Sequence, residues 1–375
     1  MIPLFSTHIP EHTAEKVCEL IKSGWINRGK NAFLFEETFR IKFGYEHVLS
    51  VNSATSALRM AYEISKEFGK GKDEVITTPY TMVATNTAIL EAGLKPCFVD
   101  IQYGTANIDP FKVLDAINER TLAIVGVDYA GYPCDWEDLQ VLAKDYNVML
   151  IDDAAHALGA KLNGKATGKY VDMACYSFQA VKHINTGDGG MFVCSRDDIY
   201  ELAKKKIWFG IDKAKRVESP LGIYPVDIDT LGFKYAMNDI AAVMGLEGLK
   251  DFDKVSQRRR EIAKWYHDEL QYRVKVELMD YEDFNKVHAY WLFPIHVDKR
   301  MIFAEYMRSK GIEVAVHNWR NDNYSIFKSQ VGRLLYRPRE LDQVEVVNKD
   351  LIHIPMHAEL TDDQVEYIIK TIRSW

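Results

Sequence analysis

The stretch HVLSVNSATSALRMAYEISKEF, residues 47–68, decides the fold class of this 375-residue chain. It opens with a short apolar run, residues 47–52, that is typical of a buried strand. A small polar loop follows, and residues 55–68 then carry the pattern of an amphipathic helix. A strand joined to a helix by a few residues is the βα unit from which parallel sheets are built.

The same alternation of strand and helix continues along the chain. Further segments typical of strands lie at residues 73–79, 95–101, 122–128 and 148–154. Helix-like segments lie between them, at residues 81–93, 109–120 and 135–147. Two later strands are expected at 172–178 and 190–195. The sequence therefore predicts an α/β fold with a mainly parallel central sheet flanked by helices.

The pattern changes near residue 250. A long charged helix is predicted at 251–270, and a strand at 290–297 and helices at 300–311 and 362–375 follow it. These elements are typical of a smaller α+β domain, and 375 residues suffice for two domains. We expect a large domain over residues 1–250, N-terminal segment included, and a small C-terminal domain over residues 251–375.

Composition and charge argue against several classes of partner. A net charge of −7 disfavours nucleic acid or an anionic membrane as the main partner. The five cysteines are widely spread without a C-x-x-C pair, as expected of free thiols in a reducing compartment. No apolar stretch approaches the ~18 residues needed to cross a bilayer, and no signal peptide is indicated. We expect a soluble cytoplasmic protein that binds neither nucleic acid nor membrane and holds no metal.

Polar residues at the ends of predicted strands are the first candidates for a site, because ligands of open α/β sheets bind there. Residues 52–56, Asn-Ser-Ala-Thr-Ser, open the first helix. Small side chains leave backbone N–H groups accessible, and a helix N-terminus favours an anion such as phosphate. The alternative is a simple helix cap.

Two carboxylates end another strand. Asp152 and Asp153 follow the apolar run of residues 148–151, and a buried carboxylate is costly unless a cation or a protonated ring nitrogen pairs with it. Either aspartate could instead cap the next segment. His156 follows three residues later, and a hydrogen-bonded structural histidine is the alternative there.

Lys182 stands in SFQAVKHINTGDGG, residues 177–190, five residues before a glycine-rich turn. A lysine near such a turn is ordinarily solvated, whereas a lysine that forms an imine needs a desolvated site with a charged neighbour. Taken together, a phosphate site at Thr55-Ser56, a carboxylate for a pyridinium at Asp153 and an imine-forming Lys182 are what pyridoxal 5′-phosphate (PLP) chemistry requires.

These segments resemble a known family. SFQAVKHINTGDGG, LIDDAAHALGA (150–160), NSATSAL (52–58) and DYAGYPCD (128–135) are similar to motifs of the DegT/DnrJ/EryC1/StrS family of PLP-dependent sugar aminotransferases. The likeness covers nearly the whole chain and implies the aspartate aminotransferase type-I fold.

The resemblance implies roles for particular residues. Lys182 is expected to bind the cofactor aldehyde and to move the proton of the reaction, and Asp153 to bind the pyridine nitrogen. His156 is expected near the 3-oxygen or the face of the ring. The remaining implied positions are those around the cofactor phosphate: Ala54, Thr55 and Ser177.

The family usually forms homodimers with active sites at the interface, so a homodimer with shared active sites is expected here. In the matching segment, residues 231–242, Lys234 and Asn238 are candidates to reach the partner's cofactor phosphate. Ala236 departs from the family's frequent Arg or Asn. An ordinary helix start capped by Asn238 is the alternative.

Other departures concern the cofactor ring and the substrate. Met82 stands where relatives usually place an aromatic ring on the cofactor, and a thioether can still pack there. Asp128 replaces a frequent histidine. His317 matches a family histidine near the substrate, but Trp319 and Arg320 follow it in an unusual loop, and they could clamp a phosphate or stack on a base. A surface loop with a half-buried Trp is the alternative.

The resemblance thus predicts a PLP-dependent aminotransferase that moves an amino group from L-glutamate to a keto-sugar, namely a nucleotide-linked 4-keto-6-deoxyhexose. Three alternatives remain open. The acceptor could be a smaller phosphorylated keto compound, the reaction could be a PLP-dependent sugar dehydration, or the chain could be a catalytically silent regulatory relative. Lys182 favours amino transfer, because some dehydratases of the family carry histidine at this position.

Overall fold

The computed structural model describes the whole chain except residues 213–214, 223–226, 272–274, 281–283 and 329–339. Its centre is a seven-stranded sheet in the order β1-β9-β8-β5-β4-β2-β3. The strands are β1 (His47–Val51), β2 (Glu74–Thr77), β3 (Lys95–Phe98), β4 (Thr121–Val127), β5 (Met149–Asp153), β8 (Met173–Ser177) and β9 (Gly190–Cys194). Strands β8, β5, β4, β2 and β3 are parallel, whereas β9 pairs antiparallel with both β8 and β1. The predicted α/β class and mainly parallel sheet are confirmed.

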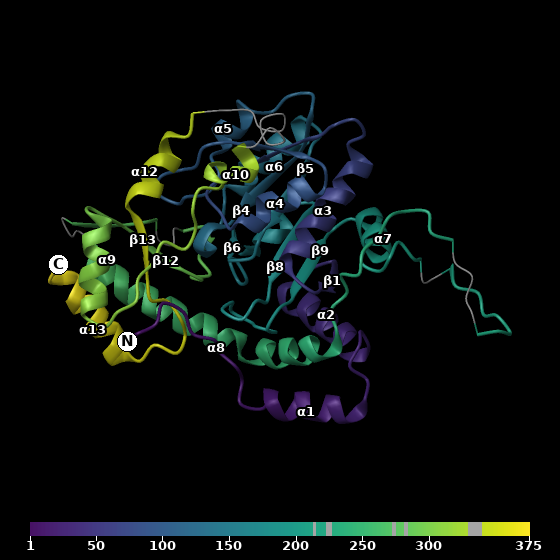
Figure 1. Cartoon of the computed structure of the whole chain (residues 1–375), viewed down its shortest axis with the longest axis horizontal. Coiled ribbons are helices and arrows are strands. Elements are labelled where there is room, and N and C mark those ends of the chain that lie inside the picture. Colours follow the sequence, from purple (N-terminus) through teal and green to yellow (C-terminus); the bar gives the residue numbers. More distant parts are fainter. Residues whose placement is uncertain (213–214, 223–226, 272–274, 281–283, 329–339) are drawn as a thin grey trace.

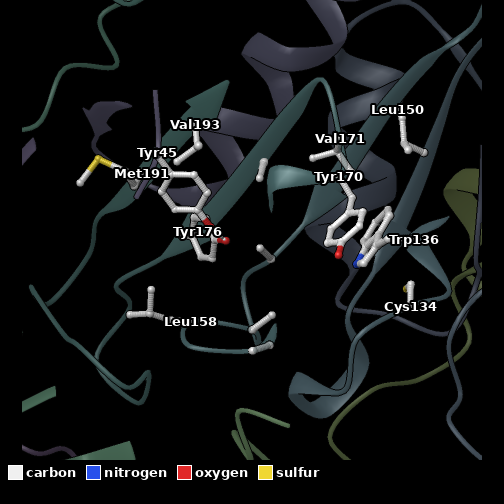
Figure 2. Packing of buried hydrophobic residues seen from close by; sticks show 14 of the residues in the cluster. Tyr45, Cys134, Trp136, Leu150, Leu158, Tyr170, Val171, Tyr176, Met191 and Val193 are labelled. Carbon is white, nitrogen blue, oxygen red and sulfur yellow. Dashed lines mark hydrogen bonds between the residues drawn. The ribbon is translucent and has the colours of Figure 1, made fainter. Parts of the chain in front are cut away.

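Helices cover both faces of this sheet. The helices of this part are α1 (Thr13–Ser23), α2 (Lys30–Phe43), α3 (Ala54–Phe68), α4 (Val83–Glu91), α5 (Pro110–Leu114), α6 (Trp136–Asp145) and α7 (Asp197–Lys206). One core cluster joins α2 and α6 to the sheet through Phe39 and Trp136, and Figure 2 shows part of it, including Trp136 and Tyr170. A second cluster packs α3, α4 and α7 on the sheet through Leu58, Ile89 and Ile199.

The helix predicted at 109–120 is wrong in length, since α5 ends at Leu114. The side chain of Asn118 explains the early end. Its amide donates to Glu74 Oε2 at 2.9 Å, and its backbone N–H donates to Thr121 Oγ1 at 3.0 Å. These bonds turn the chain directly into β4.

Helix α8 (Asp239–Leu270) is 32 residues long and runs along the molecule from the large sheet to a second core (Figure 1). It passes through residue 250 without a break, so the predicted division into residues 1–250 and 251–375 stays a prediction. The second core contains an antiparallel sheet of β10 (Val276–Leu278), β12 (Phe293–Val297) and β13 (Leu351–Ile354). It is packed against α9 (Arg300–Ser309) and α13 (Asp362–Arg373).

Shorter elements complete the described part of the chain. A third small sheet consists of β11 (Lys286–Val287), β6 (Lys161–Leu162) and β7 (Lys165–Ala166). The remaining helical elements are α10 (Ser325–Lys328), α12 (Asp342–Asp350) and the 3₁₀ turns Tyr129–Gly131, Thr167–Lys169 and Asn321–Asn323. Between α7 and α8 the described residues 211–212, 215–222 and 227–232 belong to an arm that projects from the body (Figure 1). Among the described residues, none of the helices combines the length and apolar character that crossing a membrane requires.

Candidate functional site

A cavity of about 340 Å³ lies at the carboxyl ends of the central strands. Its walls come from the loop after β1, the start of α4, the ends of β5 and β8, and a segment before β12. Eight of the predicted site residues line it: Ala54, Thr55, Met82, Asp153, His156, Ser177, Lys182 and His317. Segments distant in the sequence therefore meet here, as the topology of an open α/β sheet requires.

The start of α3 provides a position for an anion. Ser53 caps this 15-residue helix by accepting the backbone N–H of Ser56 at 3.0 Å. Within the described ranges, the N–H groups of Ala54 and Thr55 have no hydrogen-bond partner. A Cβ on Gly190 would lie 2.7 Å from Ala54 N, so glycine alone lets β9 approach the helix start so closely. The free N–H groups of Ala54 and Thr55 and the positive end of the α3 dipole therefore lie at the cavity, which Ser177 also lines, and they favour an anion there.

The two aspartates at the end of β5 have different surroundings, because successive side chains of a strand point to opposite faces. Asp153 lines the cavity and accepts a hydrogen bond from Thr85 Oγ1 at 2.6 Å. Asp152 is fully buried and accepts from Thr167 Oγ1 at 3.0 Å. Burial raises the pKa of Asp153, which the bond from Thr85 opposes. No ion pair with Asp153 occurs in the part of the chain that the structure describes.

Lys182 lies on the face of a tryptophan. Its Nζ is 3.2 Å from the centre of the Trp291 ring, and the indole Nε1 of Trp291 donates to Val181 O at 3.1 Å. Burial lowers the pKa of Lys182 well below its ordinary value, although the negative charge of Asp153 acts in the opposite direction. A lysine with a lowered pKa has a larger fraction of the neutral amine that can attack a carbonyl carbon.

Two histidines surround the same tryptophan. His156 stacks on Trp291 with ring centres 3.9 Å apart. The ring of His317 is nearly perpendicular to that of Trp291, with ring centres 4.9 Å apart. Burial lowers the pKa of His156 well below its ordinary value and that of His317 to about 4, and in both cases Lys182 adds to the effect. Both rings are therefore neutral at pH 7. His156 Nδ1 is buried and has no hydrogen-bond partner among the described residues, so it is available to a ligand.

Four predicted site residues do not line this cavity. Asn238 caps α8 by accepting the N–H of Ala241 at 2.9 Å, and Lys234 forms an isolated β-bridge with Trp208. The side chain of Trp319 is largely exposed. The fourth is Arg320, whose guanidinium forms ion pairs with two carboxylates. Its Nη2 lies 2.8 Å from Asp322 Oδ2, and its Nη1 pairs with Glu345.

The sequence analysis missed Trp291 and Thr85. Trp291 is 1% exposed, and it comes from the segment before β12, distant in the sequence from the cofactor motifs. No local pattern marks it, because an aromatic residue before a buried strand is usually part of the core. Thr85 lies in α4, close to Met82, and its hydroxyl could have been suspected from its place near the end of β2.

These residues fit PLP. The N–H groups of Ala54 and Thr55 can donate hydrogen bonds to its phosphate, and Asp153 is a buried carboxylate without an ion pair in the described structure, as a protonated ring nitrogen requires. The unpartnered Nδ1 of His156 can bind a polar ring substituent. Lys182 supplies the amine for the aldehyde.

Comparison with known proteins agrees with this fit. Residues 7–373 match the model of the DegT/DnrJ/EryC1/StrS aminotransferase family. A UDP-4-amino-4,6-dideoxy-N-acetyl-beta-L-altrosamine transaminase of Campylobacter jejuni is 31% identical over 100% of this chain and 97% of its own length. The sugar aminotransferase CalS13 of Micromonospora echinospora has a similar structure, with a TM-score of 0.92, 30% identity and full coverage of both chains.

A further similar structure bears on the cofactor. The putative sugar aminotransferase Spr1654 of Streptococcus pneumoniae, solved in its PLP form, has a TM-score of 0.88 and 26% identity over 100% of this chain and 98% of its own. The family match spans almost the entire sequence, and the residues at the cavity suit the cofactor. The chain therefore belongs to the DegT/DnrJ/EryC1/StrS aminotransferase family and is a PLP-dependent transaminase.

Proposed function

We propose that this transaminase moves the amino group of L-glutamate to a nucleotide-linked 4-keto-6-deoxyhexose and that it works in the cytoplasm as a homodimer with shared active sites. The observation that carries the amino-transfer reaction is the amine of Lys182 in the same cavity as Asp153 and the free N–H groups of α3. The nucleotide-linked acceptor is supported by the C. jejuni relative, whose name specifies a UDP-linked amino sugar.

The balance of the reaction is simple. Glutamate gives up its amino group and two electrons and becomes 2-oxoglutarate, and the keto-sugar gains both and becomes an amino-sugar. When bound, PLP would supply an aldehyde that condenses with amines and a ring that withdraws electrons from the reacting carbon, and it would carry the amino group and two electrons from donor to acceptor.

The side chains of this protein supply the rest. Lys182 Nζ accepts a proton from the carbon of the donor and later returns one to the carbon of the acceptor, and its lowered pKa favours the neutral amine that acts as the base. Asp153, fixed by Thr85, keeps a positive charge on the ring nitrogen. Neutral His156 offers a hydrogen bond without adding a second positive charge beside Lys182.

Incubation of the purified protein with PLP, L-glutamate and a panel of acceptors tests this function. The panel contains nucleotide-linked 4-keto-6-deoxyhexoses and small phosphorylated ketones. We expect 2-oxoglutarate and an amino-sugar nucleotide in equal amounts, and loss of both with Lys182→Ala. No turnover of any nucleotide keto-sugar would contradict the proposed acceptor, and loss of water from the sugar without 2-oxoglutarate would indicate a dehydratase. A protein that binds no PLP would indicate a regulatory relative.

Exposed apolar side chains support the homodimer. On the projecting arm, Leu221 is 82% and Leu231 is 79% exposed, and Trp25 on the body is 82% exposed. An isolated subunit that presents such residues on an extended arm is suited to bind another subunit. The segment after the arm lies beside the cofactor site, because Asn52 N donates to Tyr235 O at 2.7 Å. We therefore keep Lys234 and Asn238 as candidates for contacts across the interface.

A further inference from the structure

We propose that the protein has a second ligand site, a cationic cavity that binds a small phosphate-bearing anion. This cavity has a volume of about 430 Å³ and lies between the end of α2, the β6–β7 hairpin and the middle of α8. None of its lining residues belongs to the PLP cavity. Its volume is within the range of sites for small molecules, roughly 300–1,000 Å³.

Charge is the first argument. Five cations, Lys42, Lys161, Lys165, Lys169 and Arg260, line the cavity. The single carboxylate in its wall, that of Asp253, is bound by Lys42 at 2.8 Å. The other four cations form no ion pair with any residue that the structure describes. Lys161, Lys165 and Lys169 are exposed, so on a chain of net charge −7 they form a local positive patch that attracts anions to the cavity.

The three consecutive arginines of α8 show how specific this arrangement is. Arg258 pairs with Asp362 at 2.8 Å. Arg259 is buried and donates to the carbonyl oxygens of Tyr290 and Met356, at 3.0 Å each. Arg260 alone is left without an acceptor in the described part of the chain, and it faces the cationic cavity.

A buried hydroxyl is the second, independent argument. Ser256, one helical turn before Arg260, lines the cavity and is 5% exposed. Its Oγ has no hydrogen-bond partner within the described ranges, and a buried hydroxyl left unbonded costs roughly 1–3 kcal/mol. A phosphate oxygen would accept a hydrogen bond from this hydroxyl, and the negative charge of the phosphate would pair with the cations around it.

The wall beside Ser256 includes Phe252 and Gly159. The ring of Phe252 is buried, and a Cβ on Gly159 would lie 2.8 Å from it. Gly159 also has φ +91°, which glycine adopts readily. A cavity of this size, with Phe43 and Phe252 in its wall and cations around them, suits a compact ligand such as a sugar phosphate or a nucleotide, whereas nucleic acid would require an extended basic surface.

Isothermal titration of the PLP-loaded protein with inorganic pyrophosphate tests the proposal, because PLP then occupies the first phosphate position. We expect saturable binding that weakens about tenfold or more in Lys165→Gln/Lys169→Gln, since each lost charge removes a charge-assisted contact. The matched control is Lys22→Gln/Lys112→Gln, two exposed lysines outside the cavity, which should bind as the wild type does. Ser256→Ala, which keeps every charge, should also weaken binding.

Titrations of the wild type and of Lys165→Gln/Lys169→Gln with glucose 1-phosphate and UDP then distinguish a sugar phosphate from a nucleotide, because only binding that this variant weakens belongs to the cationic cavity. The proposal fails if the wild type shows no saturable pyrophosphate binding, or if the cavity variant and the control variant bind equally well. Binding of long polyanions without binding of pyrophosphate would also overturn it. Melting temperatures of all variants exclude misfolding as the cause of lost binding, and transaminase activity does not enter this test.

Discussion

At the scale of single residues, the hydrogen bond from Thr85 to Asp153 decides how well the cavity holds a protonated ring. The 2.6 Å bond stabilises the carboxylate form of Asp153, whose pKa burial would otherwise raise further. Thr85→Val keeps the shape and removes the donor, so we expect PLP affinity to fall about 30-fold, equivalent to about 2 kcal/mol for a bond to a charged group. Thr85→Ser keeps the hydroxyl and should bind PLP almost normally. Titration of the apoprotein with PLP measures both, and equal affinities would contradict this role.

A second prediction at this scale concerns Asp128, where burial raises the pKa to about 6. Its Oδ1 accepts the N–H of Cys134 at 2.7 Å and Trp136 Nε1 at 2.9 Å, while Oδ2 has no partner among the described residues. A pKa above the unfolded value of about 3.9 means that the folded state holds this proton more tightly. The stabilisation is complete below the unfolded pKa and is lost as the pH rises through the folded pKa.

In Asp128→Asn the carboxyl group is replaced by an uncharged amide, which does not titrate between pH 4 and pH 8. The decrease in its unfolding free energy between pH 4 and pH 8 should therefore be smaller than that of the wild type, by as much as about 3 kcal/mol for two pKa units. The control is Asp138→Asn, an exposed carboxylate on α6, which should follow the wild-type curve. Urea unfolding at several pH values measures the difference, and parallel curves for Asp128→Asn and the wild type would refute the prediction.

At the scale of elements, α8 fixes the position of Trp291 through one arginine. Arg259 donates to the carbonyl oxygens of Tyr290, Trp291 and Met356 at 3.0, 3.2 and 3.0 Å. The guanidinium is buried, and burial lowers its pKa to about 10. We expect Arg259→Gln to destabilise the fold by about 3 kcal/mol, because buried carbonyls lose their donors. Arg260→Gln should change stability by less than about 0.5 kcal/mol. Denaturant unfolding compares the two, and similar losses for both would contradict this account.

Local patterns explain which elements and site residues could be predicted from the sequence. Ala54, Asp153 and Ser177 each end a strand of a βα unit or follow one, so one topological rule brings them together. Trp291 belongs to a separate buried cluster, which also contains Tyr80 and Tyr129, and no spacing in the sequence reveals that this cluster borders the site. For Arg320 the residue type was suggestive, but Asp322 and Glu345 neutralise it. Its partner Glu345 lies in a helix, α12, that the sequence analysis did not predict.

At the scale of the whole molecule, the projecting arm is hard to account for in an isolated subunit, because its apolar side chains are exposed to water. Leu221 and Leu231 lie on it with about four fifths of their surfaces exposed, which is unfavourable in water unless another surface covers them. If the arm binds a second subunit, Leu221→Asp/Leu231→Asp should shift the protein from dimer to monomer, because two charges would be buried at the interface.

The matched control is Phe111→Asp, at an equally exposed apolar residue on α5, and it should leave the dimer intact. Light scattering after size-exclusion chromatography measures the mass. A wild-type monomer, or a variant that remains dimeric, would contradict the role of the arm, and loss of PLP affinity on dissociation would support active sites shared between subunits.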